Sequence, residues 1–72
     1  MASKNPVFKN LEVEMVKAGF SKSKLANALG VSYVTLLLRM DGSRDFKLGE
    51  MQKIKMLLQS KLTLDELFKR EA

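Results

Sequence analysis

The chain has 72 residues and a mass of 8.1 kDa, which is enough for one small domain. Its composition, with 46% hydrophobic and 29% charged residues, is typical of a folded domain rather than a disordered tail. It contains no cysteine and no histidine, which excludes disulfides, thiol or imidazole catalysis and the usual zinc, haem and iron–sulfur ligands. A net charge of +5 and a pI near 9.8 favour a polyanionic partner: nucleic acid, an anionic membrane surface or an acidic protein.

The first predicted helix begins close to the N-terminus. Asn5 reads as an N-cap and Pro6 as the first helical residue. Apolar residues then recur at three- and four-residue spacing up to Gly19, namely Phe8, Leu11, Met15 and Ala18. This spacing predicts an amphipathic helix.

Two short helices are predicted next, each with its own serine cap. Ser21 can cap a helix over residues 22–29, which Gly30 ends because glycine takes a positive φ without penalty. Ser32 can cap a helix over residues 33–40. Only three residues separate the two helices.

A fourth helix follows Phe46, with four apolar residues predicted on one face and Lys53 and Lys55 away from it: Leu48, Met51, Ile54 and Leu58. Thr63 and Glu66 form the capping box of a fifth helix, and the apolar residues of this helix would pack it against the rest of the fold. No segment alternates with period two, so no strands are expected. The sequence predicts an all-α, compact bundle of about five short helices.

Residues 21–42 have the pattern of a helix-turn-helix. Two short helices joined by a glycine turn must cross at close range, and Ala26 supplies the small side chain that such a contact admits. An apolar wedge lies beneath them, formed by Leu25, Leu29, Val31 and Leu36. In this motif the second helix protrudes far enough to enter a major groove.

The chain resembles the Cro and lambda-repressor-like (XRE-type) family of helix-turn-helix regulators, in its phage-encoded branch. Matching residues stand in register at Leu25-Ala26, Gly30-Val31-Ser32, Thr35-Leu36 and Asp41-Gly42, and the similarity extends through Phe46 to Glu50 and Leu64 to Phe68. The resemblance implies one lambda-repressor-like domain over residues 1–72. It also implies a transcriptional regulator of a phage or prophage switch between lysogeny and lysis, in the cytoplasm of a bacterial host.

The same resemblance implies which residues bind operator DNA, the double-stranded partner of the family. Its phosphate contacts correspond to Lys22, Lys24, Arg44 and Lys47, and lysines and helix N-termini attract phosphate on physical grounds as well. Its base contacts correspond to Ser32, Tyr33, Val34, Leu37 and Leu38. In a dimer bound to the operator, the residues expected to face or flank the groove are Ser32, Tyr33, Thr35 and Arg39.

The third predicted helix departs from the family pattern. Val34, Leu37 and Leu38 can touch a thymine methyl but cannot hydrogen-bond to a base edge. Leu36, Leu37 and Leu38 span about 200° of a helix, so at least one of the three is expected to be exposed. An exposed apolar patch commonly marks a protein contact, although packing within the fold or a homodimer seam would also account for the leucines.

A second hypothesis therefore keeps the fold and changes the partner. In it the chain is an antirepressor that binds a phage repressor protein and masks or alters its DNA binding, through Tyr33, Val34, Leu37 and Leu38. A membrane-surface peptide is disfavoured because the helices are short and separately capped. We expect no enzymatic activity, no small-molecule substrate, no metal and no cofactor.

Overall fold

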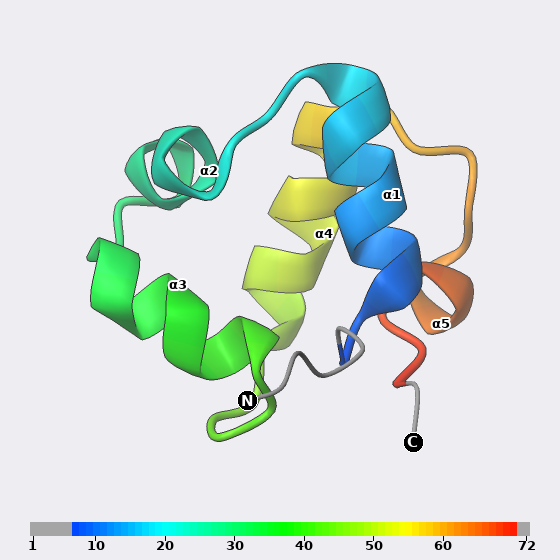
Figure 1. The fold of residues 1–72 in the computed structure, drawn as a ribbon. Coiled ribbons are helices and arrows are strands. Elements are labelled where there is room, and N and C mark those ends of the chain that lie inside the picture. Colours follow the sequence, from blue (N-terminus) through cyan, green and yellow to red (C-terminus); the bar gives the residue numbers. More distant parts are fainter. Residues whose placement is uncertain (1–6, 71–72) are drawn as a thin grey trace, which may run out of the picture.

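A computed structural model describes residues 7–70 and contains five helices and no strand in that range. They are α1 (Lys9–Ala18), α2 (Lys22–Leu29), α3 (Tyr33–Met40), α4 (Leu48–Leu58) and α5 (Leu64–Leu67). The predicted all-α bundle is confirmed. In Figure 1, α4 runs through the middle of the molecule, with α1 and α5 on one side and α2 and α3 on the other.

The predicted serine caps define α2 and α3. The hydroxyl oxygen of Ser21 accepts a hydrogen bond from the Lys24 amide at 3.1 Å, and that of Ser32 accepts one from the Thr35 amide at 3.0 Å. Gly30 ends α2 with φ 75°, a left-handed conformation that costs glycine little. Local hydrogen bonds thus set the bounds of both helices where the sequence predicts them.

The capping box of α5 is also confirmed. Thr63 Oγ1 accepts from the Glu66 amide at 3.2 Å, and Glu66 Oε1 accepts from the Thr63 amide at 3.0 Å. The helix is only four residues long. It is docked by the fully buried side chain of Leu67 and by Asn10 of α1, whose Nδ2 donates to the Glu66 carbonyl at 2.8 Å.

The start of α1 differs from the prediction. Asn5 and Pro6, the predicted cap and first helical residue, lie outside the described residues, and α1 begins only at Lys9. Phe8 has a non-helical backbone, with φ −111° and ψ 75°. It is buried in an aromatic cluster with ring centroids 5.1–6.0 Å apart, formed by Phe8, Phe46 and Phe68. The turn that places Phe8 in this cluster delays the helix.

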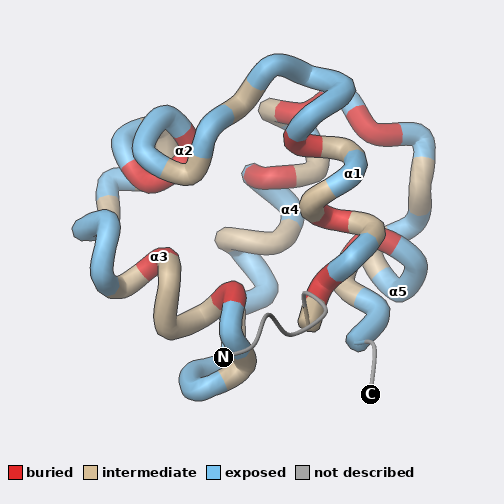
Figure 2. Tube along the Cα trace, viewed as in Figure 1, coloured by how far each residue is buried: buried red, intermediate tan, exposed pale blue. Residues whose placement is uncertain are grey.

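One apolar core joins all five helices (Figure 2), and its buried residues are Phe8, Leu11, Met15, Leu25, Ala26, Leu36, Met40, Ile54, Leu58 and Leu67. The prediction for the inner face of α4 was wrong at one position. Ile54 and Leu58 are buried and Met51 is half-buried, but Leu48 is 59% exposed. At 100° per residue, Leu48 lies about 120° from Ile54 around the helix, away from the core.

The segment between α4 and α5 is held by polar contacts. Ser60 is buried, and its hydroxyl donates to Glu14 Oε1 of α1 at 2.8 Å. The ammonium of Lys55 donates to the carbonyls of Ser60 at 2.8 Å and Leu62 at 2.6 Å. Lys55, which the sequence places away from the apolar face of α4, therefore fixes the approach to α5.

This network makes part of the stability depend on pH. The hydrogen bond from Ser60 lowers the pKa of Glu14, burial opposes this effect, and Lys17 adds to the lowering. A carboxyl whose pKa is lowered by folding stabilises the fold above its unfolded pKa, and this contribution disappears as the pH falls through the folded pKa. In Ser60→Ala we expect the pKa of Glu14 to rise, and the destabilisation to be larger at neutral pH than in acid.

Proton titration of Glu14 by NMR, with urea unfolding at both pH values, measures this effect. Lys17→Gln is the comparison variant, because it removes the other partner that lowers the pKa of Glu14, an exposed ammonium that lies 3.3 Å from Glu14 Oε2, and leaves the buried Ser60 bond in place. An unchanged Glu14 pKa in Ser60→Ala would contradict the assigned cause.

Candidate nucleic-acid interface

The α2–α3 pair leaves one face of α3 exposed. Val31, in the turn, donates its amide to the Ala26 carbonyl at 3.1 Å, which folds the chain back at the end of α2. Ala26 is buried and Leu36 is fully buried, so α3 turns one side toward the core. On its other side Val34 is 64% exposed, and Tyr33, the first residue of the helix, is 48% exposed.

The two remaining leucines of α3 are intermediate in burial. Leu36 lies in the core, whereas Leu37 and Leu38 are half-buried. The apolar face available to a partner therefore centres on Tyr33 and Val34, with Leu37 and Leu38 at its margin. All four residues of the predicted protein interface belong to this apolar face of α3.

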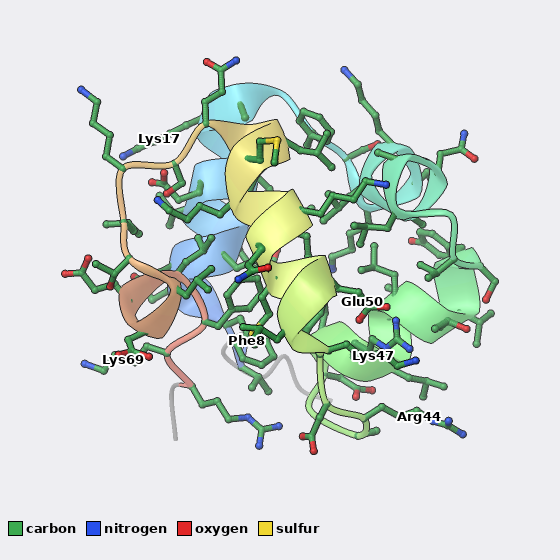
Figure 3. The ribbon with its side chains drawn as sticks, turned by 180° about the vertical axis from the view of Figure 1, so that it is seen from behind. Phe8, Lys17, Arg44, Lys47, Glu50 and Lys69 are labelled. Atoms are coloured by element: carbon green, nitrogen blue, oxygen red, sulfur yellow. The ribbon has the colours of Figure 1, made fainter. Side chains whose placement is uncertain are left out.

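The predicted phosphate-binding cations lie in α2, which packs against α3, and in the segment that follows α3. Lys24 is exposed in the first turn of α2, and its ammonium lies 4.8 Å from the centroid of the Phe20 ring. Arg44 and Lys47 are exposed in the segment that follows α3, and Figure 3 places both on the α3 side of the molecule. Lys22 is half-buried beside Glu12, with Nζ 3.8 Å from Oε2. Three of the four predicted phosphate-binding residues are thus exposed, and Arg44 and Lys47 are the two that lie on the α3 side in Figure 3.

The hydroxyls at the start of α3 are engaged with each other. Besides accepting from the Thr35 amide, the Ser32 hydroxyl donates to Thr35 Oγ1 at 2.8 Å. Ser32 is exposed and Thr35 is half-buried. Both residues were predicted to face or flank a DNA groove, and in the structure their hydroxyls serve the helix cap.

Arg39, the fourth predicted groove residue, points toward α4. Its guanidinium donates to Glu50 Oε2, and the two side chains are only 14% and 18% exposed. The Arg39 Nε is buried with no hydrogen-bond partner among the described residues. The structure thus places Arg39 between α3 and α4 rather than on the exposed face of α3.

Glu50 is a site residue that the sequence reasoning did not identify. Its second oxygen, Oε1, accepts the Lys47 amide at 3.0 Å, so one carboxylate joins α3 to the first turn of α4 (Figure 3). The sequence gives one indication that Arg39 faces another helix: it follows Leu36 by three residues, and this spacing puts it near the inner side of α3. Its partner is 11 residues away, on another helix.

Across residues 7–70, no helix combines the length and apolar character needed to cross a membrane. The same range contains no group of three or more acidic side chains placed to hold a metal ion.

Comparison of the chain with protein-family models, with curated protein sequences and with solved structures found no match. A functional assignment therefore depends on the chemistry of α3 and of the residues around it.

Proposed function

We propose that the protein is a helix-turn-helix regulator that binds duplex operator DNA with α3 in the major groove. The observation that supports this most directly is an exposed part of α3, at Tyr33 and Val34, with the exposed cations Arg44 and Lys47 on the same side of the molecule and Lys24 exposed on the adjoining helix α2. A helix of this diameter fits the major groove, and the cations would meet phosphates on either side of it. The net charge of +5 supplies the attraction to a polyanion.

The proposed regulator acts as a dimer in a phage or prophage switch. Two copies of α3 would then reach successive major grooves one helical turn apart, as in other proteins that bind DNA through this motif. The phosphate-binding residues are Lys22, Lys24, Arg44 and Lys47. Tyr33 and Val34 meet the bases, with Ser32 and Thr35 at the edge of the groove.

The salt dependence of duplex binding tests this proposal. Each phosphate contact releases counterions, so the logarithm of the affinity should fall steeply and linearly with the logarithm of the salt concentration. Replacing Arg44 and Lys47 together by glutamine should lower the slope by about 2 and weaken binding roughly ten-fold at physiological salt.

The matched control removes two charges from the opposite side of the molecule, where Lys17 and Lys69 lie (Figure 3). Lys17→Gln with Lys69→Gln has the same net charge as the site variant, and we expect its slope to stay close to that of the unmodified chain. Equal slopes for the two double variants would contradict phosphate binding at the end of α3.

The apolar character of the exposed α3 face supports a second candidate function, an antirepressor that binds a phage repressor protein through Tyr33, Val34, Leu37 and Leu38. This second candidate predicts that the chain does not bind duplex DNA even at low salt. It also predicts a complex with the repressor that Val34→Asp abolishes. Val34 is chosen because its exposure lets a charge be added without disturbing the core.

A further inference from the structure

We infer that α3 distinguishes DNA sequences mainly by the 5-methyl groups of thymine, and not by hydrogen bonds to base edges. This inference depends on the proposed DNA binding and specifies the chemistry that the site recognises. It follows from which side chains of α3 are engaged within the fold and which are left exposed.

Most polar side chains at the start and along the length of α3 already have partners inside the protein. The Ser32 hydroxyl accepts from the Thr35 amide and donates to Thr35 Oγ1. An exposed arginine could bind guanine in a bidentate manner. The guanidinium of Arg39 donates instead to Glu50, and its side chain is only 14% exposed. Reading bases with these groups would require breaking bonds that define and dock the helix.

The exposed part of α3 is apolar apart from the hydroxyl of Tyr33. Val34 presents an isopropyl group that is 64% exposed, Tyr33 presents a ring that is 48% exposed, and Leu37 and Leu38 adjoin them. In the major groove, the apolar group that a base pair offers is the thymine methyl. Cytosine and uracil lack this methyl, whereas 5-methylcytosine carries it.

The charges around this face favour DNA as its occupant. Arg44 and Lys47 are exposed on the α3 side of the molecule (Figure 3), and Lys24 is exposed on α2, which packs against α3. A phosphate backbone complements this arrangement of cations around an apolar contact. Phosphate contacts would supply most of the affinity, while the methyl contacts of Val34 and Tyr33 would supply the preference among sequences. Burying each additional methyl group should strengthen binding about four-fold.

The experiment begins with selection of bound duplexes from a random-sequence pool by the full chain. The selected site is then synthesised with deoxyuridine in place of thymidine, first at single positions and then at pairs. We expect each contacted thymine to lose about four-fold in affinity on this exchange, and two of them to lose about fifteen-fold. Deoxyuridine placed outside the selected site should leave the affinity unchanged. A 5-methylcytosine·guanine pair should bind better than an unmethylated cytosine·guanine pair at the contacted positions.

The variant Val34→Ser links this preference to α3. It should bind thymine and uracil duplexes with nearly equal affinity at the position that Val34 contacts, while the preference at a position contacted by Tyr33 is kept. Its salt slope should stay unchanged, since no cation is altered. Equal affinity of the unmodified chain for the two duplexes, with a steep salt slope, would overturn this inference and leave DNA binding intact. Absence of duplex binding at every salt concentration would overturn the proposed function, and with it this inference.

Discussion

Leu36→Ala is expected to lower the free energy of unfolding by about 2–5 kcal/mol. Leu36 is fully buried and belongs to the core residues of α3, so the substitution leaves a cavity where α3 meets the rest of the protein. A domain of this size commonly has only about 5 kcal/mol of total stability, so the variant should keep about 3 kcal/mol at most, and at the upper end of the range a large fraction should be unfolded at room temperature. Urea unfolding followed by circular dichroism measures the change.

Val34→Ala is the matched control for this substitution. It also shortens an aliphatic side chain of α3, but at a position that is 64% exposed. Its effect on the unfolding free energy should stay within about 0.5 kcal/mol. Similar losses in Leu36→Ala and Val34→Ala would contradict the orientation of α3.

Glu50→Ala is expected to destabilise the fold by about 2–3 kcal/mol, because it removes a charge-assisted hydrogen bond and the acceptor for the Lys47 amide. The Arg39 guanidinium would then be left largely buried without its counter-charge. We also expect weaker duplex binding, since this carboxylate fixes α3 relative to the segment that carries Arg44 and Lys47.

The double variant Arg39→Met with Glu50→Leu distinguishes the stability contributed by the ion pair from the cost of leaving one charge unpaired. Replacing both charges by apolar side chains of similar size should restore much of the stability, because no unpaired charge remains. Glu12→Ala is the comparison at the surface: its pair with Lys22 spans 3.8 Å and is more exposed, so its loss should cost less than about 1 kcal/mol. A Glu50→Ala variant as stable as Glu12→Ala would show that the Arg39–Glu50 pair does not hold α3.

Much of the secondary structure could be predicted from the sequence because it depends on local hydrogen bonds. Ser21, Ser32 and Thr63 cap helices at the predicted positions, and in each case the acceptor and donor lie three residues apart. Such contacts form between neighbours in the chain and leave a recognisable pattern. The start of α1 was not predicted correctly, because packing of the Phe8 ring against Phe46 and Phe68 determines the backbone there.

The arrangement of the candidate site depended more on contacts between distant residues. The exposure of Val34 follows from a helical periodicity in which Leu36 faces the core, because the two residues lie about 200° apart around α3. Tyr33 lies only about 60° from Leu36, at the first position of the helix, so periodicity alone does not predict its exposure. The pairing of Arg39 with Glu50 could not be inferred in the same way. It requires the C-terminal part of α3 to lie beside the first turn of α4, and that placement depends on the packing of the whole bundle.

Binding of duplex DNA by α3 and the cations around it can be observed residue by residue, in an NMR titration of the isotope-labelled chain with a selected duplex. The largest amide shifts are predicted in residues 21–24, 33–38 and 44–47, with residues 60–67 little affected. Shifts concentrated in α1 and α5, or no shifts on addition of the duplex at low salt, would contradict this mode of binding.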